Sequence, residues 1–360
     1  MQSLMMKKLF YIPVLLLLLL SSCKSKRNLV SSLPQQVMKG DSTRLSDTIG
    51  LSSALSPMLT FDQSDLRNVR RRPVKRPAGK PKKEEPSKPH RQIVQRGTRI
   101  TVKTVHVPSS YEGVSRIKVY DFTHRDVPAA FEGFRIAFVS DLHYKSLLKE
   151  KGLNDLARLL IDQKADVLLI GGDFHEGCQY VPPVMAALAK VKTPMGTYAV
   201  LGNNDYEACY DDIVREMDHY GMHLLEHKVD TLNREGARIL VAGVRNPFDL
   251  TQNGKSPTLG LSPDDFVILL THTPDYAEDV PVTNSDLVLA GHTHGGQVTL
   301  FGLYAPIVPS HYGQRFLTGL KYNSKHIPMI ITNGIGTSQK AVRMFAPAEV
   351  IMIVLHQLKD

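Results

Sequence analysis

Carboxylate, imidazole and amide side chains recur in this sequence directly after short apolar runs, where they could hold metal ions. Seven residues share this position: Asp141, His143, Asp173, Asn203, His272, His292 and His294. Carboxylate and amide oxygens, together with imidazole nitrogens, are donors for hard-to-borderline divalent metals. A single residue separates Asp141 from His143 and His292 from His294, so both members of each pair could reach one ion. The pattern therefore indicates a metal centre.

The apolar runs that precede these side chains have the length and the boundaries of buried strands. For example, the run 136–139 precedes Asp141, and the run 167–172 precedes Asp173. Short apolar runs bounded by glycine and polar residues are typical of fully buried strands. Open α/β sheets place their sites at the C-terminal ends of such strands. Glycines at positions 171, 172, 202, 291, 295 and 296 would let the backbone approach a metal ion and a phosphate.

Five blocks occur in a fixed order: Asp-Leu-His at 141–143, Gly-Gly-Asp at 171–173, Gly-Asn-Asn-Asp at 202–205, Thr-His at 271–272, and Gly-His-Thr-His-Gly-Gly-Gln at 291–297. Together they resemble the calcineurin-like metallophosphoesterase family, over roughly residues 110–356. The stretch 333–349 resembles its membrane-associated bacterial subgroup of phosphodiesterases and UDP-diacylglucosamine pyrophosphatase-like enzymes. The resemblance implies an α/β fold, a four-layer α/β/β/α sandwich of two mixed sheets flanked by helices.

The resemblance also implies which residues hold which ion. Asp141, His143 and His294 would bind one ion; Asn203, His272 and His292 would bind the other; and Asp173 would bridge both. Such mixed oxygen and nitrogen ligands admit two divalent ions from among Mn, Fe, Zn and Ni. Two ions clamp a phosphoryl oxygen and lower the pKa of a shared water, whose hydroxide attacks phosphorus. The expected substrate is a phosphodiester, a pyrophosphate or a phosphomonoester, with Asp173 among the catalytic residues.

Asn204 departs from the family pattern, which usually has histidine at this position as a proton donor or phosphate contact. An amide can donate a hydrogen bond, but it does not give up a proton at neutral pH. The leaving group could depart unprotonated, or His175, two residues after Asp173, could take the catalytic role. Alternatively the protein is a non-catalytic, metal-dependent lipoprotein that binds a phospholigand.

Residues 1–23 have the features of an export signal. Lys7 and Lys8 precede an apolar stretch, 9–20, that is short for a membrane-spanning helix. The ending Leu-Ser-Ser-Cys at 20–23 resembles a bacterial lipoprotein cleavage box, so Cys23 would carry the lipid. The alternative is a plain secretory signal or anchor. We expect an exported, membrane-anchored bacterial lipoprotein in the periplasm or cell envelope.

Residues 24–95 have the composition of a disordered, basic, Pro- and Ser-rich tether, followed by the phosphoesterase domain at 96–360. Eleven basic and two acidic residues lie between Arg67 and Arg91, which accounts for the formal net charge of +9. The run could bind anionic lipid or envelope phosphates, or serve only as an extended spacer. Nucleic acid is a poor candidate because an exported protein rarely meets it. The domain itself is close to neutral and is not a polyanion-binding surface.

Hydrophobic periodicity predicts the coarse elements of the domain. A hairpin is expected from the runs 100–107 and 115–120, and helices from 153–163, 181–190 and 210–220. Strands are expected at 223–225, 238–244, 266–271, 286–290, 298–301, 329–332 and 350–355. The Pro- and Gly-containing segment 245–264 is expected to be a long loop near the site, which could gate or select substrate. Cys178 and Cys209 could pair in an oxidising envelope or remain separate thiols.

Overall fold

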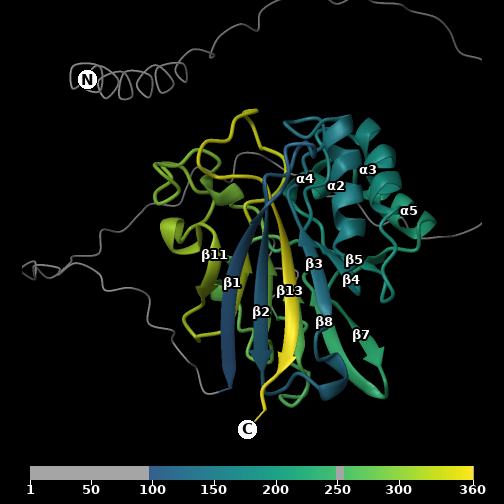
Figure 1. Ribbon diagram of the computed structural model, residues 1–360, viewed down its shortest axis with the longest axis vertical. Coiled ribbons are helices and arrows are strands. Elements are labelled where there is room, and N and C mark those ends of the chain that lie inside the picture. Colours follow the sequence, from purple (N-terminus) through teal and green to yellow (C-terminus); the bar gives the residue numbers. More distant parts are fainter. Residues whose placement is uncertain (1–96, 249–254, 360) are drawn as a thin grey trace, which may run out of the picture. The chain divides into compact units, whose positions relative to one another are not determined.

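The computed structural model describes residues 97–248 and 255–359 (Figure 1). The predicted signal peptide and tether, 1–23 and 24–95, lie outside these residues. Two sheets form the centre of the described chain, and helices cover the first sheet. The α/β class with two mixed sheets and flanking helices, expected from the sequence, is confirmed. Among the described residues, no helix has both the length and the apolar character needed to cross a membrane.

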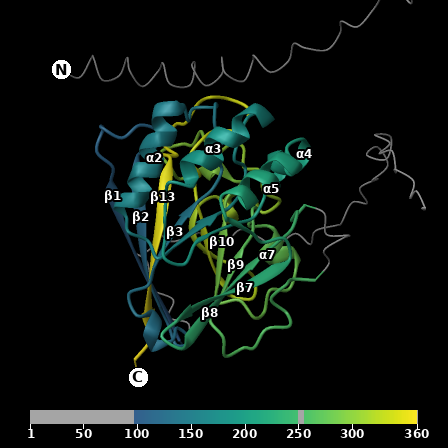
Figure 2. The same ribbon diagram turned by 90° about the vertical axis from the view of Figure 1, so that its right-hand side faces the viewer.

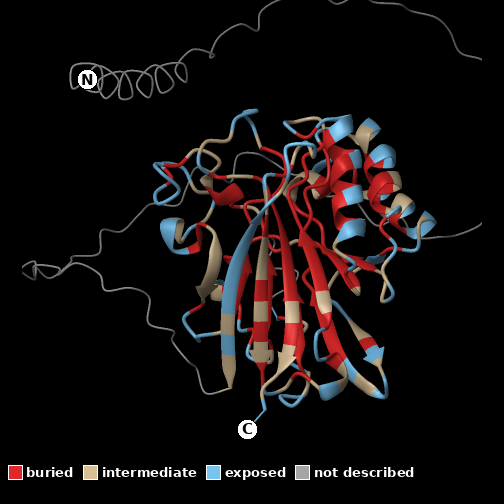
Figure 3. Cartoon of the chain, viewed as in Figure 1, coloured by how far each residue is buried: buried red, intermediate tan, exposed pale blue. Residues whose placement is uncertain are grey.

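The first sheet has seven strands and contains both termini of the domain. In spatial order they are β1 (Thr98–His106), β2 (Arg116–His124), β13 (Glu349–Gln357), β3 (Arg135–Val139), β4 (Val167–Ile170), β5 (Thr197–Ala199) and β6 (His223–Leu224). From β3 to β6 the strands are parallel, so their C-terminal ends meet at one edge. The predicted hairpin is confirmed: β1 pairs antiparallel with β2 and is exposed along most of its length (Figure 3).

The second sheet has six strands and packs its inner face on the first. Its order is β11 (Gly319–Tyr322), β12 (Pro328–Ile331), β10 (Leu287–Ala290), β9 (Val267–Leu270), β8 (Ala237–Gly243) and β7 (Lys228–Arg234). The strands β8, β9, β10 and β12 are mutually parallel. Figure 2 shows the two sheets side by side. Buried residues of both sheets, such as Phe138 and Ile268, form one apolar layer between them.

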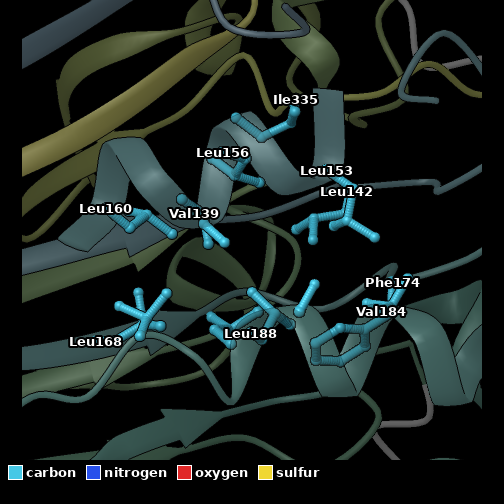
Figure 4. Packing of buried hydrophobic residues seen from close by; sticks show 14 of the residues in the cluster. Val139, Leu142, Leu153, Leu156, Leu160, Leu168, Phe174, Val184, Leu188 and Ile335 are labelled. Carbon is cyan, nitrogen blue, oxygen red and sulfur yellow. The ribbon is translucent and has the colours of Figure 1, made fainter. Parts of the chain in front are cut away.

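Helices cover the outer face of the first sheet because each presents an apolar stripe. They are α2 (Glu150–Asp162), α3 (Val181–Leu188) and α5 (Tyr210–His219), with the short α4 (Asn203–Glu207) before α5. In α2 the stripe is Leu153, Leu156 and Leu160, at the spacing of one helix face. Figure 4 shows Leu156 and Leu160 next to Val139 of β3. Full burial of each leucine stabilises the fold by about 1.5–3 kcal/mol.

The outer face of the second sheet has a thinner cover. The one-turn α7 (Tyr276–Asp279) and the 3₁₀ turn η5 (Gly313–Phe316) pack on it through Tyr276 and Phe316. Three further 3₁₀ turns are η2 (Ala129–Phe131), η3 (Cys178–Tyr180) and η4 (His294–Gly296). The expected strand at 298–301 is wrong. Val298 forms only isolated bridges to Met344 and Phe345, because this segment crosses a loop and does not join a sheet.

Candidate metal centre

The predicted ligands converge where strands of both sheets end. Asp141, His143, Asp173 and Asn203 follow β3, β4 and β5 of the first sheet, and His272, His292 and His294 follow β9 and β10 of the second. Parallel strands bring their C-terminal ends to a common edge, so residues far apart in sequence come together. Because each sheet supplies part of the donor set, the centre depends on how the two sheets pack.

Asp141, His143 and His294 form the first cluster, and all three side chains are buried. Their donor atoms lie within 4.8 Å of one another. The Nε2 atom of His294 is 3.4 Å from Oδ1 of Asp141, and the rings of His143 and His294 are 5.0 Å apart. These are the residues that the sequence assigned to one ion.

Asp173, His272 and His292 form the second cluster, again with donor atoms within 4.8 Å of one another. The Oδ2 atom of Asp173 is 3.4 Å from Nε2 of His272 and 3.2 Å from Nε2 of His143. One carboxylate oxygen of Asp173 therefore contacts a histidine from each cluster. This is the position that the predicted bridging role requires.

The backbone at these positions is held in a conformation that L-residues seldom adopt. Five of the seven predicted ligands have positive φ: Asp141 (53°), His143 (39°), Asp173 (56°), His292 (66°) and His294 (52°). Non-glycine residues in this region cost of the order of 1 kcal/mol or more each, and they concentrate at functional sites. The surrounding loops thus stabilise a strained arrangement that aims these side chains inward.

Two glycines make room for the carboxylates. A Cβ atom at Gly202 would lie 2.1 Å from Oδ1 of Asp173, and one at Gly291 would lie 2.2 Å from Oδ2 of Asp141. No larger residue fits either place without moving a carboxylate. Both glycines are among those for which the sequence predicts a close approach of the backbone.

Buried polar atoms without partners show that the residues fit metal ions. Among the residues that the structure describes, Oδ1 of Asn203 and Nδ1 of His294 are buried without a hydrogen-bond partner, and Nε2 of His143 faces only the carboxylate of Asp173. In addition, Nδ1 of His292 faces Nε2 of His272 at 3.2 Å, an arrangement of two nitrogens that suits a shared positive ion. Buried polar groups without partners are costly, and divalent cations would satisfy these donors. Two divalent metal ions are the cofactors of this domain.

Charge interactions within the clusters shift several pKa values. Burial lowers the pKa of His143, but the carboxylates of Asp173 and Glu176 outweigh it and raise the value to about 10. Burial raises the pKa of Asp173, but His272 and His143 outweigh it and hold the value well below its usual range. Burial and the neighbouring His272 lower the pKa of His292 to about 3. Asp173 is therefore a carboxylate, and the imidazole of His292 is neutral.

The Asn-Asn-Asp block at 203–205 lies beside both clusters. The Nδ2 amide of Asn203 donates to Oδ1 of Asn204 at 3.0 Å, which leaves Oδ1 of Asn203 free to act as a ligand. The backbone N–H of Asn204 donates to Oδ1 of Asp173 at 3.0 Å. Asp205 is fully buried and accepts from the backbone N–H groups of Gly202 and Asp173. Its carboxylate thus joins the loop of Asp173 to the loop that precedes Asn203.

His175 lies in neither cluster, whereas Glu176, which the sequence did not single out, contacts His143. His175 is buried, accepts from the backbone N–H of Gly177, and faces Asp205 at 3.6 Å. It belongs to neither cluster, so its catalytic role remains a prediction. Glu176 was missed: its Oε1 is 2.6 Å from Nδ1 of His143. A carboxylate on the far nitrogen of a metal-binding histidine fixes the ring and its tautomer. No local sequence pattern links Glu176 to His143, which lies 33 residues away.

Two further features frame the centre. Cys178 and Cys209, whose pairing the sequence left open, form a disulfide. It joins the loop that follows Asp173 to the one that follows Asn204. Phe248, from the long loop predicted at 245–264, places its ring 5.0 Å from that of His292. That loop therefore reaches the site, as expected from the sequence.

Comparisons with known protein sequences agree with the geometry of the site. Residues 134–296 match the family model described as calcineurin-like phosphoesterase. The chain is 27% identical over 237 residues to the uncharacterized metallophosphoesterase YkuE of Bacillus subtilis (strain 168), covering 64% of this chain and 81% of that protein. It is 28% identical over 242 residues to the phosphodiesterase YaeI of Escherichia coli (strain K12), covering 62% and 82%. A solved structure from Thermus thermophilus is 17% identical and covers 44% of this chain and 81% of that one, with a TM-score of 0.32.

Proposed function

Because the chain contains a calcineurin-like metallophosphoesterase domain and is a metal-dependent phosphohydrolase, we propose that it cleaves phosphodiesters or pyrophosphates at the bacterial cell envelope. The observation that carries the proposal is the pair of facing clusters, Asp141-His143-His294 and Asp173-His272-His292. The relative named phosphodiesterase YaeI supports the choice of a diester.

The residues that would hold the ions are the seven predicted from the sequence. Asp141, His143 and His294 would hold one ion, Asn203, His272 and His292 the other, and Asp173 both. When bound, two such ions supply electrophilic stabilisation of phosphoryl oxygens and acidify water. The chain supplies the orientation of the ligands: Glu176 fixes His143, and the carbonyl of Gly171 accepts from Nδ1 of His272 at 2.7 Å.

Asn204 would contact the substrate through its side-chain amide. Nδ2 of Asn204 lies 3.3 Å from Nδ1 of His143, but that nitrogen must carry a proton for its 2.6 Å contact with Glu176. It therefore cannot accept from Asn204, whose N–H groups remain available to a phosphoryl oxygen. Without a proton donor here, the site favours leaving groups that depart as anions, such as phenolates and nucleotide phosphates.

The envelope location rests on the sequence. The Leu-Ser-Ser-Cys box supports lipidation of Cys23, and the basic run 67–91 supports contact with anionic lipid or wall phosphates. A lipid- or sugar-linked phosphate would be the accessible substrate for an enzyme so anchored. Replacement of Cys23 by serine should abolish lipid attachment, so that the protein no longer incorporates labelled fatty acid in cells. Labelled protein carrying Cys23→Ser would contradict the anchoring through Cys23.

Bis-p-nitrophenyl phosphate tests the activity directly. The purified, metal-loaded protein should hydrolyse it when Mn²⁺ is supplied, and Asp173→Ala should lose at least about 10³-fold in rate, since bridging is lost. A panel of lipid, sugar-nucleotide and nucleotide phosphoesters would then define the substrate. Tight binding of phospholigands without turnover on any of these compounds would favour the alternative, a non-catalytic binding lipoprotein. The observation that favours this alternative is that position 204 is asparagine and not histidine.

A further inference from the structure

Large apolar side chains are exposed on the loops that follow the last metal-ligand block. Phe301, Leu303 and Ile307 have 75%, 84% and 76% of their surface exposed, and Tyr304 and Phe345 have 50% and 58%. We refer to these five residues as the apolar rim. Contiguous exposed apolar surface of this kind usually marks an interaction site.

The apolar rim is built directly onto the candidate metal centre. Its first loop begins after His294, and the backbone carbonyl of Gln297 accepts a hydrogen bond from the backbone N–H of Met344 at 2.7 Å. The rings of Phe301 and Phe345 lie 5.5 Å apart across these two segments. Arg343 donates to the carbonyl of His294 at 3.1 Å. The rim therefore lies at the end of the sheets where the ligands converge, and Figure 1 shows the yellow loop that leads into β13 at that end of the domain.

A hollow extends the rim towards the first sheet. It has a volume of about 880 Å³, and its lining includes Leu147, Phe301 and Phe345. Leu147 is itself 42% exposed, and Lys145 and Lys149 flank it in the sequence. Glu112 also lines the hollow, where it pairs with Lys151 at 3.5 Å. Exposed apolar side chains flanked by lysines are typical of a surface that binds lipid head groups.

The segment that carries most of the rim is basic in sequence. Between Asp286 and Glu349 it contains no acidic residue and five basic ones: Arg315, Lys321, Lys325, Lys340 and Arg343. Arg315 pairs with Glu278 and Arg343 donates to backbone carbonyls, whereas Lys325 and Lys340 are exposed. Lys340 is exposed beside the rim segment. An anionic surface complements this charge, whereas a second copy of the same face would bring like charges together. The basic run 67–91 is likewise of the same sign.

We propose that the apolar rim docks the folded domain on an anionic lipid bilayer, with the metal centre facing the membrane surface. The aromatic and aliphatic side chains enter the head-group region, and the lysines meet anionic lipid. This contact is separate from the predicted lipid on Cys23: the lipid would hold the chain at the membrane, and the rim would orient the domain on it. It deepens the proposed envelope function, because phosphoesters in the bilayer surface would then reach the site directly, but its test does not require activity.

The absence of tryptophan from the chain makes a direct test possible. In the full chain carrying Cys23→Ser, Phe301→Trp provides a single indole in the rim. Ile161→Trp provides the matched control, since Ile161 is 48% exposed at the end of α2, next to the start of β4 and away from the ligand end. Vesicles of phosphatidylglycerol and phosphatidylcholine with brominated acyl chains should shift the rim indole to shorter wavelength and quench it. The control indole should change little.

A variant that introduces two negative charges into the rim completes the test. Leu303→Glu with Ile307→Glu should weaken sedimentation with these vesicles by about tenfold or more, because two side chains lose apolar transfer. Hydrolysis of bis-p-nitrophenyl phosphate in solution should remain within about twofold, so failure of docking and failure of the enzyme assignment are distinguishable. Equal quenching of both indoles would overturn the proposal. The proposal would also be overturned if the emission of the rim indole were already blue-shifted without vesicles. If dilution reversed that shift, a second copy of the chain would cover the rim; if it did not, the N-terminal segment of the same chain would cover it.

Discussion

The amide of Asn204 determines which leaving groups the proposed site can expel. Its backbone N–H anchors it to Asp173, so a side chain of similar size can replace it without losing that contact. Asn204→His would add a group that can give up a proton near neutral pH. We expect the rate on alkyl phosphodiesters to rise about 10–100-fold, with little change on bis-p-nitrophenyl phosphate, whose phenolate needs no proton. A parallel change on both substrates would argue against a leaving-group effect.

Glu176 should control metal affinity through His143. Its carboxylate lies 2.6 Å from Nδ1 of His143, so it holds the ring with Nε2 directed into the site. Glu176→Gln keeps the shape but weakens this orientation, and a loss of about 10–100-fold in metal affinity is expected. Metal titration followed by elemental analysis measures it. If the negative charge of the carboxylate orients His143, Glu176→Asp should recover part of the lost metal affinity. Unchanged affinity in Glu176→Gln would show that other contacts position His143.

Residue types and spacing were sufficient to bring out the seven candidate ligands, because each follows a strand that the apolar pattern also predicts. The roles of these residues stay predictions, but the structure brings six of them together in two clusters and places Asn203 beside them. Glu176 was missed because its partner, His143, is 33 residues away and no local pattern links them. His175 was chosen by sequence proximity to Asp173, yet positive φ at Asp173 turns the chain so that the His175 ring faces Asp205.

At the scale of elements, the disulfide ties together the two loops that hold Asp173 and Asn203. It closes a loop of 31 residues, for which chain entropy predicts a stabilisation of about 3–4 kcal/mol. Replacing Cys178 and Cys209 together by serine should lower the melting temperature by roughly 10 °C. Reductant should lower that of the parent by a similar amount and leave the double variant unchanged. A parent protein insensitive to reductant would show that the bond contributes little to stability.

The start of β10 carries a carboxyl group whose ionisation opposes folding. Asp286 accepts from the backbone N–H of Val267 at the start of β9, and burial raises its pKa from 3.8 to about 7. The folded protein therefore binds a proton that the unfolded chain loses above pH 4, so stability falls as the pH rises from about 4 to 7. Asp286→Asn keeps an acceptor for Val267 and removes the charge.

The expected gain from Asp286→Asn is roughly 1–3 kcal/mol at pH 8, with none at pH 4, because only the ionised carboxylate is penalised. Thermal or urea unfolding across this range measures the difference. Asp264→Asn, at an exposed position nearby, is the control and should leave the pH dependence of the parent unaltered. A gain of the same size at both pH values would contradict a titration of Asp286.

The apolar runs predicted most elements but not all of them. The β4, β9 and β10 strands are continuous apolar runs and are buried throughout, as is β3 after Arg135, so they were recognisable. The β7 strand, Lys228–Arg234, was missed because as an edge strand it has only one buried side chain, Leu232. The segment 298–301 has the composition of a strand but lies in the loop that contains the first residue of the apolar rim. Its conformation is set by contacts with the loop of Met344.

At the scale of the whole domain, metal ions should connect the two sheets. The first sheet supplies Asp141, Asp173 and Asn203, and the second supplies three histidines. A bound ion would therefore cross-link two sheets that otherwise contact each other through their apolar inner faces. Ions that bind only the folded state stabilise it by about 2.7 kcal/mol at a hundredfold excess over Kd. For a domain of this size that is roughly 5–10 °C in melting temperature.

Thermal unfolding with added Mn²⁺ and after treatment with a chelator measures this effect. The parent should show the shift and lose it on chelation, and Asp173→Ala should show little of it, because its carboxylate contacts a histidine of each cluster. Asp162→Ala, at the end of α2 and outside both clusters, should shift like the parent. If Asp173→Ala shifted as fully as the parent, the ions would be bound elsewhere or within one sheet alone, and the link between the two layers would have to come from the apolar contacts only.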